Sequence, residues 1–286
     1  MGAIPAKLHS TPATGLDHRP AGLAGAVELA DPAGLADKAA SISWLVAEEV
    51  PVALEYNGRA LTVMMATPAD LEDFAVGFSL CEDIVGSADA IDQVTVREAP
   101  AGPVTGLVVS ISADPLRLLK GSLRRRSMEG RSGCGLCGVE SLENAIRDPR
   151  PVPALNFQPA PSAVAHAFAS LPDHQPMNHL NHSVHAAAWC APDGRILLVR
   201  EDVGRHNALD KLIGALGRSG VCLQDGFVVM SSRCSFELVQ KAATVGIGML
   251  ANLSAPTELA LRLARSSGIT LAARSRGRGV MLFNER

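Results

Sequence analysis

The chain has 286 residues, of which 47% are hydrophobic and 19% are charged, and its formal net charge is −3. This length predicts one large domain or two small ones, and the hydrophobic fraction is sufficient for a buried core, which excludes disorder along the whole chain. The slightly negative charge argues against a general nucleic-acid binder, so an anionic ligand would have to be bound by local arginines.

No segment approaches the ~20 consecutive apolar residues that a membrane-spanning helix requires. No apolar stretch follows the few charges near the N-terminus, as it would in a signal peptide. We therefore expect a cytoplasmic protein that does not enter a membrane. In that compartment the six cysteines are expected to be reduced thiols, metal ligands or catalytic groups, because disulfide frameworks belong to oxidising compartments.

Residues 1–40 are rich in Ala, Gly, Pro and Asp and show no sustained helical or strand periodicity. They are interpreted as a mobile N-terminal tail, with a short helix within residues 25–40 as the alternative. Ordered structure is expected to begin near Ser41, and residues 41–130 are interpreted as a small N-terminal α+β subdomain.

Two β-prone runs, Val52–Tyr56 and Ala60–Met65, flank Asn57-Gly58. They predict a β-hairpin, because both turn residues readily adopt positive φ. Thr67-Pro68 then predicts a helix start, with the threonine as N-cap and the proline at the first helical position. A further strand is predicted at Val104–Ile111. Apolar residues recur on one face of the predicted helix, at Leu71, Phe74, Ala75 and Phe78.

The segment from Pro149 to Pro176 is rich in proline and is interpreted as a linker or an irregular crossing. Beyond it strands and helices alternate, which predicts an α/β layer sandwich with some parallel strand pairing. The predicted strands are Val184–Cys190, Arg195–Glu201, Phe227–Met230, Ile247–Leu250, Ile269–Ala273 and Val280–Phe283. The predicted helices are Asn207–Leu216, Ser235–Val245 and Pro256–Arg265.

The first chemical motif is Gly133–Gly138, in which Cys134 and Cys137 lie three positions apart among glycines. Such a pair can bind a metal, form a disulfide or carry sulfur as a persulfide, and two buried thiols without a role are the alternative. A helix predicted at residues 141–147 would place the pair near its N-terminus. There the helix dipole and the preceding basic run at Arg124–Arg126 would favour the nucleophilic thiolate.

A zinc site is the competing interpretation of this motif, because His182 and His185 could complete a Cys2His2 set with Cys134 and Cys137. The long separation along the chain argues against a compact zinc finger but does not forbid convergence in three dimensions. Cys234 lies in a predicted strand-to-helix loop and stays open between packing and chemistry. The remaining cysteines are interpreted as packing residues, namely Cys81, Cys190 and Cys222.

Two predicted strand-to-helix junctions, Glu201–Lys211 and Ser231–Arg233, carry polar residues suited to an anion. Ligands of α/β sheets bind beyond the carboxyl ends of strands, and helix N-termini favour phosphate. Together the junctions predict an anion or nucleotide pocket, with a capped helix in a solvated charge cluster as the alternative. The candidate ligand-binding residues here are Arg205, His206, Ser232 and Arg233.

A basic loop is predicted between the last two strands. Arginine binds phosphate oxygens through two parallel hydrogen bonds, and glycine allows close backbone approach. The loop therefore indicates a second phosphate-binding segment, and a solvated basic turn is the alternative. Its residues are Arg274, Ser275, Arg276, Gly277, Arg278 and Gly279.

Taken in order along the chain, these segments resemble the FdhD family, the formate dehydrogenase accessory sulfurtransferases. The resemblance is carried by the CxxC motif, by the block from Glu201 to Lys211, and by shorter runs on either side, and it spans roughly Ser41 to Phe283. The shorter runs are Val50-Pro51-Val52, Met64–Ala75, Val184–Ala188, Ser231–Lys241 and Ser254–Thr257.

The resemblance implies a sulfurtransferase that takes sulfur as a cysteine persulfide from a cysteine desulfurase. It would pass the sulfur to the molybdenum bis(molybdopterin guanine dinucleotide) cofactor needed by formate dehydrogenase, a cofactor that it holds as a bound substrate. By motif match, Cys134 would carry the persulfide beside Cys137, and Arg274–Gly279 would form the cofactor loop. A homodimer without a tightly bound metal is expected. The alternative is a non-enzymatic cofactor chaperone with a structural zinc at the cysteines.

The same resemblance implies that residues 131–286 form a cytidine deaminase-like α/β layer sandwich. Zinc-dependent deaminase chemistry is not expected, because the sequence has no His-x-Glu followed by Pro-Cys-x-x-Cys. The chain departs from the family pattern in two places. Asn181-His182-Ser183 stands where relatives have a small turn, and Arg274 stands where they have an aromatic residue.

Overall fold

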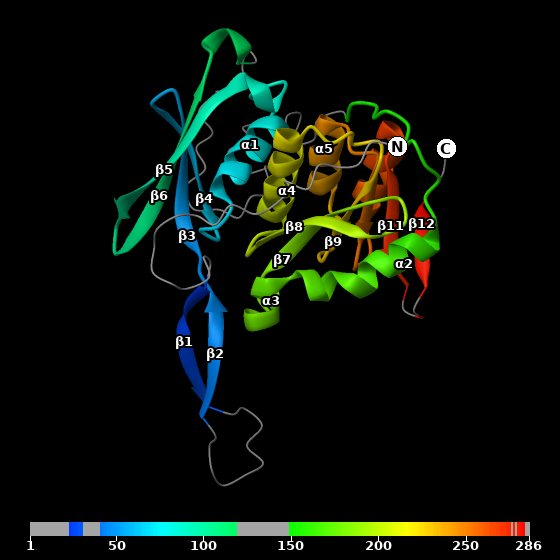
Figure 1. Ribbon diagram of the computed structural model, residues 1–286, viewed down its shortest axis with the longest axis horizontal. Coiled ribbons are helices and arrows are strands. Elements are labelled where there is room, and N and C mark those ends of the chain that lie inside the picture. Colours follow the sequence, from blue (N-terminus) through cyan, green and yellow to red (C-terminus); the bar gives the residue numbers. More distant parts are fainter. Residues whose placement is uncertain (1–22, 31–40, 119–148, 276, 278, 284–286) are drawn as a thin grey trace.

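The computed structural model describes residues 23–30, 41–118, 149–275, 277 and 279–283 (Figure 1). Its described part is a mixed α/β fold with three sheets. No helix in these segments is long and apolar enough to span a membrane. Outside them lie the boundary expected at residue 130 and four of the candidate site residues, Cys134, Cys137, Arg276 and Arg278.

The largest sheet has six strands in the order β12-β11-β10-β9-β7-β8. Strands β9, β10 and β11 pair in parallel, β7 lies antiparallel between β9 and β8, and β12 is antiparallel to β11. This confirms the predicted α/β alternation with some parallel pairing. The strands are β7 (His185–Cys190), β8 (Ile196–Asp202), β9 (Phe227–Met230), β10 (Met249–Asn252), β11 (Thr270–Arg274) and β12 (Val280–Phe283).

Helices cover both faces of this sheet and give it three layers (Figure 1). Helices α4, α5 and α6 share one apolar core with Leu250 of β10. Helix α2 shares the core on the opposite face with Met249 and Ala251. Alternation of side chains along β10 explains this division. The helices are α2 (Pro161–Ser170), α3 (Pro176–Asn181), α4 (Arg205–Ser219), α5 (Phe236–Val245) and α6 (Glu258–Ser267).

The N-terminal part has a four-stranded sheet in the order β4-β3-β6-β5, which packs on α1. Asn57 and Gly58 turn between β3 and β4 with φ of 48° and 76°, which confirms the predicted hairpin. The Asn57 side chain also exchanges two hydrogen bonds with the backbone of Ala113, at 2.8 and 3.1 Å. The elements are β3 (Val50–Tyr56), β4 (Arg59–Ala66), α1 (Leu71–Cys81), β5 (Ile91–Ala101) and β6 (Val104–Ala113).

Helix α1 begins at Leu71, later than the sequence predicts, and its N-cap is Asp70 rather than Thr67. The predicted cap is wrong because Thr67 makes its hydrogen bonds across the molecule. Its backbone N–H donates to Asp202 Oδ2 at 3.0 Å, and its hydroxyl accepts from Val203 N at 3.1 Å. Tertiary contacts at this position override the local capping signal.

Two segments are more regular than the sequence predicts. Strand β1 (Leu23–Ala30) pairs with β2 (Ser41–Ala47), so the expected irregular tail or short helix is wrong for residues 23–30. Helix α2 forms within the proline-rich segment, which the sequence predicts to be a linker or an irregular crossing, and helix α3 begins at the last residue of that segment. Pro161 and Pro176 open these helices, where the missing N–H of proline costs no hydrogen bond.

The two parts of the chain meet where α1 crosses α4 backbone to backbone. A Cβ atom added to Gly77 of α1 would overlap the carbonyl oxygen of Asp210, and one added to Gly214 of α4 would overlap that of Asp73. Both helices therefore require glycine at the crossing, because no side chain could move aside to make room. The contact places the N-terminal sheet and α1 directly on the helical layer of the larger sheet (Figure 1).

We predict that Gly214→Ala lowers the free energy of unfolding by about 2 kcal/mol or more, because overpacking against backbone has no cheap relaxation. Gly217→Ala is the matched control on the same helix. The Cβ added there would meet only the end of the Leu80 side chain, at 3.0 Å, and Ala88 Cβ, at 3.4 Å. Urea unfolding of both variants checks the prediction, and equal losses would contradict it.

Candidate functional site

Four strands of the six-stranded sheet end at one edge. Because β7 is antiparallel to both β8 and β9, the carboxyl end of β8 lies on the same edge as those of β9, β10 and β11. His185 opens β7 at this edge, opposite Asp202. The structure thus brings the segments around Arg205, Ser232 and Arg274 to the carboxyl edge of one sheet, as ligand sites in α/β folds require.

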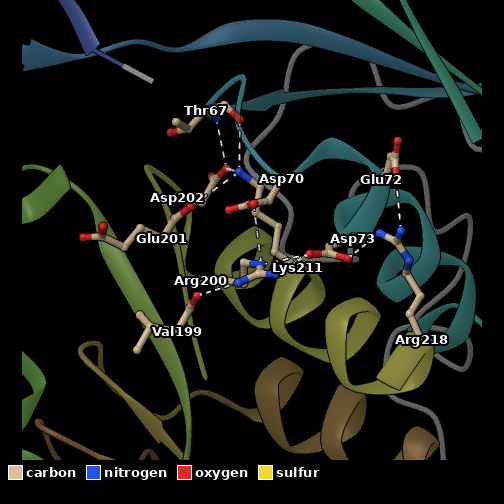
Figure 2. A network of polar contacts seen from close by, with 10 residues as sticks. All are labelled: Thr67, Asp70, Glu72, Asp73, Val199, Arg200, Glu201, Asp202, Lys211 and Arg218. Atoms are coloured by element: carbon tan, nitrogen blue, oxygen red, sulfur yellow. Dashed lines mark hydrogen bonds and ion pairs between the residues drawn. The ribbon is translucent and has the colours of Figure 1, made fainter. Parts of the chain in front are cut away.

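The loop that leads from β8 into α4 is organised by the Asp202 carboxylate. Its Oδ1 accepts from Gly204 N at 2.8 Å and from Asn207 Nδ2 at 2.9 Å. Its Oδ2 accepts from Thr67 N at 3.0 Å and lies 2.7 Å from Lys211 Nζ. Figure 2 shows this carboxylate between Thr67 and Lys211, which come from opposite sides. The Asp202 carboxylate, at the end of β8, therefore binds the backbone at the start of α4 and also contacts Thr67 and Lys211.

Lys211 is completely buried, with its side chain 0% exposed, as is that of Asp202. Its ammonium also donates to Thr67 O at 3.0 Å and to Glu201 O at 3.4 Å. The Glu201 carboxylate points the other way and accepts from the backbone of Met177 and Asn178 at the start of α3, at 2.8 and 2.9 Å. The Glu201–Lys211 block predicted from the sequence therefore forms, together with Thr67, one hydrogen-bonded unit, the bracket.

Two helix N-termini at this edge carry no side-chain cap. The N-cap of α4 is Gly204, which has no side chain, and the N-cap of α5 is Ser235, whose hydroxyl makes no cap hydrogen bond. By contrast, Thr257 caps α6 and accepts from Ala260 N at 3.3 Å. Uncapped first-turn N–H groups and the helix dipole favour an anion at α4 and α5, and in α5 the Glu237 carboxylate already lies in the first turn.

Several buried polar atoms at the same edge have no hydrogen-bond partner within the described part of the chain. They include the side-chain amide nitrogen and oxygen of Asn252, which ends β10 and is 0% exposed, and Nε2 of His206, which is 4% exposed. Arg205 Nε and Ser235 Oγ belong to the same group. Buried polar groups are normally paired, so these donors and acceptors are suited to a polar ligand that bonds to them.

His185 and His206 are both held in the neutral form. Burial lowers the pKa of His206 to about 3, with further lowering by the charges of Arg205 and Lys241. Burial also lowers the pKa of His185, reinforced by Arg205 and opposed by Asp202. Ser231 Oγ lies 3.4 Å from His185 Nδ1. A neutral imidazole can donate one hydrogen bond and accept another, and it leaves the positive charge here to arginine.

The basic loop predicted from the sequence is described only in part. Arg274 ends β11 and is exposed, and Ser275 N donates to Gly279 O at 2.8 Å, which closes the turn into β12. After β9, Arg233 is exposed, whereas Ser232 is buried and donates to Arg233 O at 3.0 Å. Ser232 thus supports the backbone of its loop, and the arginines are the groups that face solvent.

An ionic network at the α1–α4 crossing connects both helices to β8 (Figure 2). Arg200 of β8 pairs with Asp73 of α1 at 2.7 Å, and Arg218 of α4 pairs with the same carboxylate at 2.8 Å. Arg200 is only 11% exposed. The network joins β8, α1 and α4, the three elements that carry the Asp202 loop and its contacts.

The described cysteines divide between core and surface. Burial raises the pKa of the Cys190 and Cys234 thiols to about 12, so both stay protonated. Cys81 is buried as well, and burial raises its pKa. Cys222 is exposed, so its interpretation as a packing residue is wrong. It lies in the loop between α4 and β9.

The chain is similar to known proteins along most of its length. Residues 47–286 match the FdhD/NarQ family. "Sulfur carrier protein FdhD" of Xanthomonas euvesicatoria pv. vesicatoria is 46% identical over 247 residues, which cover 86% of each chain. The protein of that name from Cupriavidus necator is 50% identical over 228 residues, covering 79% of this chain and 77% of the relative.

A solved structure is also similar to the chain, with a TM-score of 0.67 and 25% sequence identity. It is described as "Crystal structure of a putative formate dehydrogenase accessory protein from Desulfotalea psychrophila". The similarity covers 91% of this chain and 95% of that one. The mixed α/β arrangement therefore recurs in that protein over almost its full length.

We predict that His206→Gln makes stability less dependent on pH. An unfolded chain binds a proton at His206 near pH 6.5, whereas burial keeps the folded pKa at about 3. The unfolded state thus binds more protons between these values, and the free energy of unfolding falls as the pH is lowered. From pH 7 to pH 5 the variant should lose about 2 kcal/mol less than the wild type. Urea unfolding at both pH values is the measurement, and parallel losses would refute it.

Proposed function

Because the chain belongs to the FdhD/NarQ family, we propose that it carries sulfur for the maturation of formate dehydrogenase. The sulfur travels as a persulfide on Cys134 and is transferred to the molybdenum of a bis(molybdopterin guanine dinucleotide) cofactor, which is the bound substrate. The observation that carries the proposal is the name of relatives 46% and 50% identical to this chain, "Sulfur carrier protein FdhD". A CxxC motif in this sequence supplies suitable thiols.

Acceptance of sulfur needs one nucleophilic cysteine. A cysteine desulfurase presents a persulfide, the Cys134 thiolate attacks its outer sulfur, and the desulfurase thiolate leaves as the new S–S bond forms on Cys134. This exchange is redox-neutral. In the sequence, glycines on both sides of the motif would permit access to the sulfur, and the arginines that precede it would favour the thiolate.

Release of the sulfur as sulfide requires two electrons, and Cys137 can supply them. Its thiolate attacks Sγ of Cys134, hydrosulfide leaves toward the metal, and the two cysteines remain joined as a disulfide. Oxidation of two thiols thus balances reduction of the outer sulfur, and a dithiol reductant restores the pair. This division assigns acceptance to Cys134 and release to Cys137.

The carboxyl edge of the six-stranded sheet is the proposed cofactor site. The cofactor carries two pyrophosphates, and the uncapped N-termini of α4 and α5 favour such anions. Arg205 at the start of α4, Arg233 in the loop after β9 and Arg274 at the end of β11 can pair with phosphate. The unpartnered amide of Asn252 and the neutral His206 offer hydrogen bonds to the uncharged parts of the ligand.

The proposal includes three protein partners. The cysteine desulfurase donates the sulfur, formate dehydrogenase receives the cofactor, and a second copy of this chain completes a homodimer. Similarity to a solved structure that is described as a putative formate dehydrogenase accessory protein supports the second partner. We expect these encounters to take place in the cytoplasm, and we expect the carrier to need no tightly bound metal.

Replacement of the two cysteines should separate the two steps. Cys134→Ala should fold normally but accept no sulfur, so whole-protein mass spectrometry after incubation with a desulfurase and cysteine should show no added sulfur. Cys137→Ala should gain one sulfur and retain it. Neither variant should restore formate dehydrogenase activity in cells that lack the native protein.

Full activity with Cys134→Ala would rule out the carrier role of this residue. Elemental analysis gives an independent control, because the carrier should contain no stoichiometric zinc when it is purified without added metal. About one zinc per chain, lost in both Cys137→Ala and His185→Ala, would support a zinc-containing chaperone instead.

Replacement of Arg274, Arg276 and Arg278 by Gln should weaken GDP binding at least tenfold, with GDP standing in for half of the cofactor. Each lost charge-assisted contact is worth about 1.5–3 kcal/mol. Calorimetry at two salt concentrations should show that wild-type binding weakens as salt rises. A control with Arg97, Arg195 and Arg262 replaced by Gln changes the net charge equally, at exposed positions outside this loop. Equal weakening in both variants would leave only a general effect of charge.

A further inference from the structure

We infer that Asp202 is a positioning residue for the proposed cofactor site, and that Lys211 and Thr67 hold it in place. The carboxylate sets the backbone at the start of α4, which presents Arg205 and His206 at the carboxyl edge. This inference rests on the proposed function, because it concerns the same site. It adds that part of the site is held in shape by the N-terminal part of the chain.

The geometry of the Asp202 carboxylate leaves little freedom to the loop. Each of its oxygens takes two donors: Oδ1 bonds Gly204 N and Asn207 Nδ2, and Oδ2 bonds Thr67 N and Lys211 Nζ, all between 2.7 and 3.0 Å. Gly204 N precedes the first turn of α4, and the Asn207 side chain lies within that turn. The same carboxylate therefore fixes Gly204 and Asn207, the residues on either side of Arg205 and His206.

Gly204 is held closely as well as hydrogen-bonded. A Cβ added to it would lie 3.1 Å from Asn207 Nδ2 and 3.4 Å from Asp202 Oδ1. The Asn207 amide makes a second hydrogen bond to Met65 O at 2.8 Å, at the end of β4. Asp202 and Asn207 thus fix the backbone at the start of α4 without a side-chain cap on the helix.

The buried charges of Asp202 and Lys211 indicate that this pair positions the loop rather than stabilises the fold. Both side chains are 0% exposed, and a buried ion pair gains little net free energy, because both charges lose their hydration. Only a carboxylate offers four acceptor positions to four donors. An asparagine in its place would turn an NH2 group toward one of these donors.

Thr67 provides the external support from the segment between β4 and α1. It contributes three hydrogen bonds to the bracket: its N–H to Asp202, its hydroxyl from Val203 N, and its carbonyl oxygen from Lys211 Nζ at 3.0 Å. Figure 2 shows Thr67 facing Asp202 from the opposite side of the loop. The bracket is complete only when the N-terminal part docks on α4.

The chain offers a matched control on the same helix. Asp210 of α4 pairs with Lys241 of α5 through two contacts of 2.8 and 2.9 Å, and their side chains are 0% and 7% exposed. Neither side chain has a hydrogen bond or ion pair with residues 203–207 in the described part of the chain, and the charge of Lys241 acts on His206 only at longer range. Removal of this pair therefore eliminates an ion pair that is buried to a similar extent as that of Asp202 and Lys211, without disturbing Gly204.

The test compares Asp202→Asn/Lys211→Met with Asp210→Asn/Lys241→Met. Each double variant removes both charges of its pair; the second also removes the contact of Lys241 Nζ with Glu82 Oε1, at 3.8 Å. Amide hydrogen exchange of a peptide covering residues 203–208, measured without ligand, should become at least tenfold faster in the first variant and stay unchanged in the second. GDP affinity should fall at least tenfold in the first only, while the urea midpoints of the two variants fall by similar amounts.

Thr67 gives a milder pair of variants in case the first double variant does not fold. Thr67→Val removes the hydroxyl that accepts from Val203 N and keeps the shape of the side chain, so exchange of residues 203–208 should rise and GDP affinity should fall severalfold. Thr67→Ser keeps the hydroxyl and should restore both values. Wild-type values in Thr67→Val would overturn the positioning role even if the double variant fails to fold.

The two readouts separate this inference from the proposed function. If the wild type binds no GDP, the proposed cofactor site fails, and hydrogen exchange alone decides whether Asp202 positions the loop. If the wild type binds GDP and Asp202→Asn/Lys211→Met retains both wild-type affinity and wild-type exchange, the positioning role fails and the site stands. If the Asp210 and Lys241 control accelerates exchange equally, the effect is general loosening of α4, and the inference is wrong.

Discussion

Helices α1 and α4 touch through their backbones, and the positions of most other elements follow from this contact. Gly77 and Gly214 leave no space between the helices, so the distance from the N-terminal sheet to the six-stranded sheet is set by main-chain atoms. Ionic groups surround the crossing where the helices diverge. Asp73 receives Arg200 and Arg218, Asp202 receives Lys211, and Asp210 receives Lys241. Main-chain contact at the centre fixes separation, and the paired charges around it fix rotation, because an ion pair of this kind tolerates little displacement.

The carboxyl edge shows how a weakly acidic protein can offer an anion a favourable place. Its positive character comes from helix N-termini and from a few arginines, whereas the two histidines stay neutral through burial. Two of the carboxylates at this edge are occupied by neighbours, whereas Glu237 Oε2, in the first turn of α5, is buried and has no hydrogen-bond partner within the described residues. Asp202 is saturated by four donors, and Glu201 binds the start of α3. Acidic side chains next to a proposed anion site would ordinarily repel the ligand, but the charge of Asp202 is neutralised and that of Glu201 is directed toward α3.

The sequence predicts local features well, because neighbours a few residues apart determine them. The Asn57-Gly58 hairpin and the alternation of strands and helices after Val184 are of this kind. The sequence wrongly predicts Thr67 as a helix cap because no local signal announces a partner 135 positions away. It does not predict strand β5, because most side chains of this strand are exposed and lack clear alternation. Of the site, the arginines and His206 are recognisable as polar residues at strand ends. Asn252 is not among the predicted site residues, although one polar residue ending the apolar run Met249–Ala251 could have revealed it.

The bracket around Thr67 makes the two parts of the chain thermodynamically linked. Any ligand that prefers the ordered start of α4 must also favour the docked state of the N-terminal sheet, since Thr67 belongs to both arrangements. Linkage is reciprocal, so whatever presses that sheet against α4 raises ligand affinity by the same factor by which the ligand tightens docking. A protein that binds the outer surface of β3, β4 or β6 could thereby adjust the occupancy of the edge without touching it. Conversely, loss of the ligand would make the N-terminal sheet slightly easier to separate from α4.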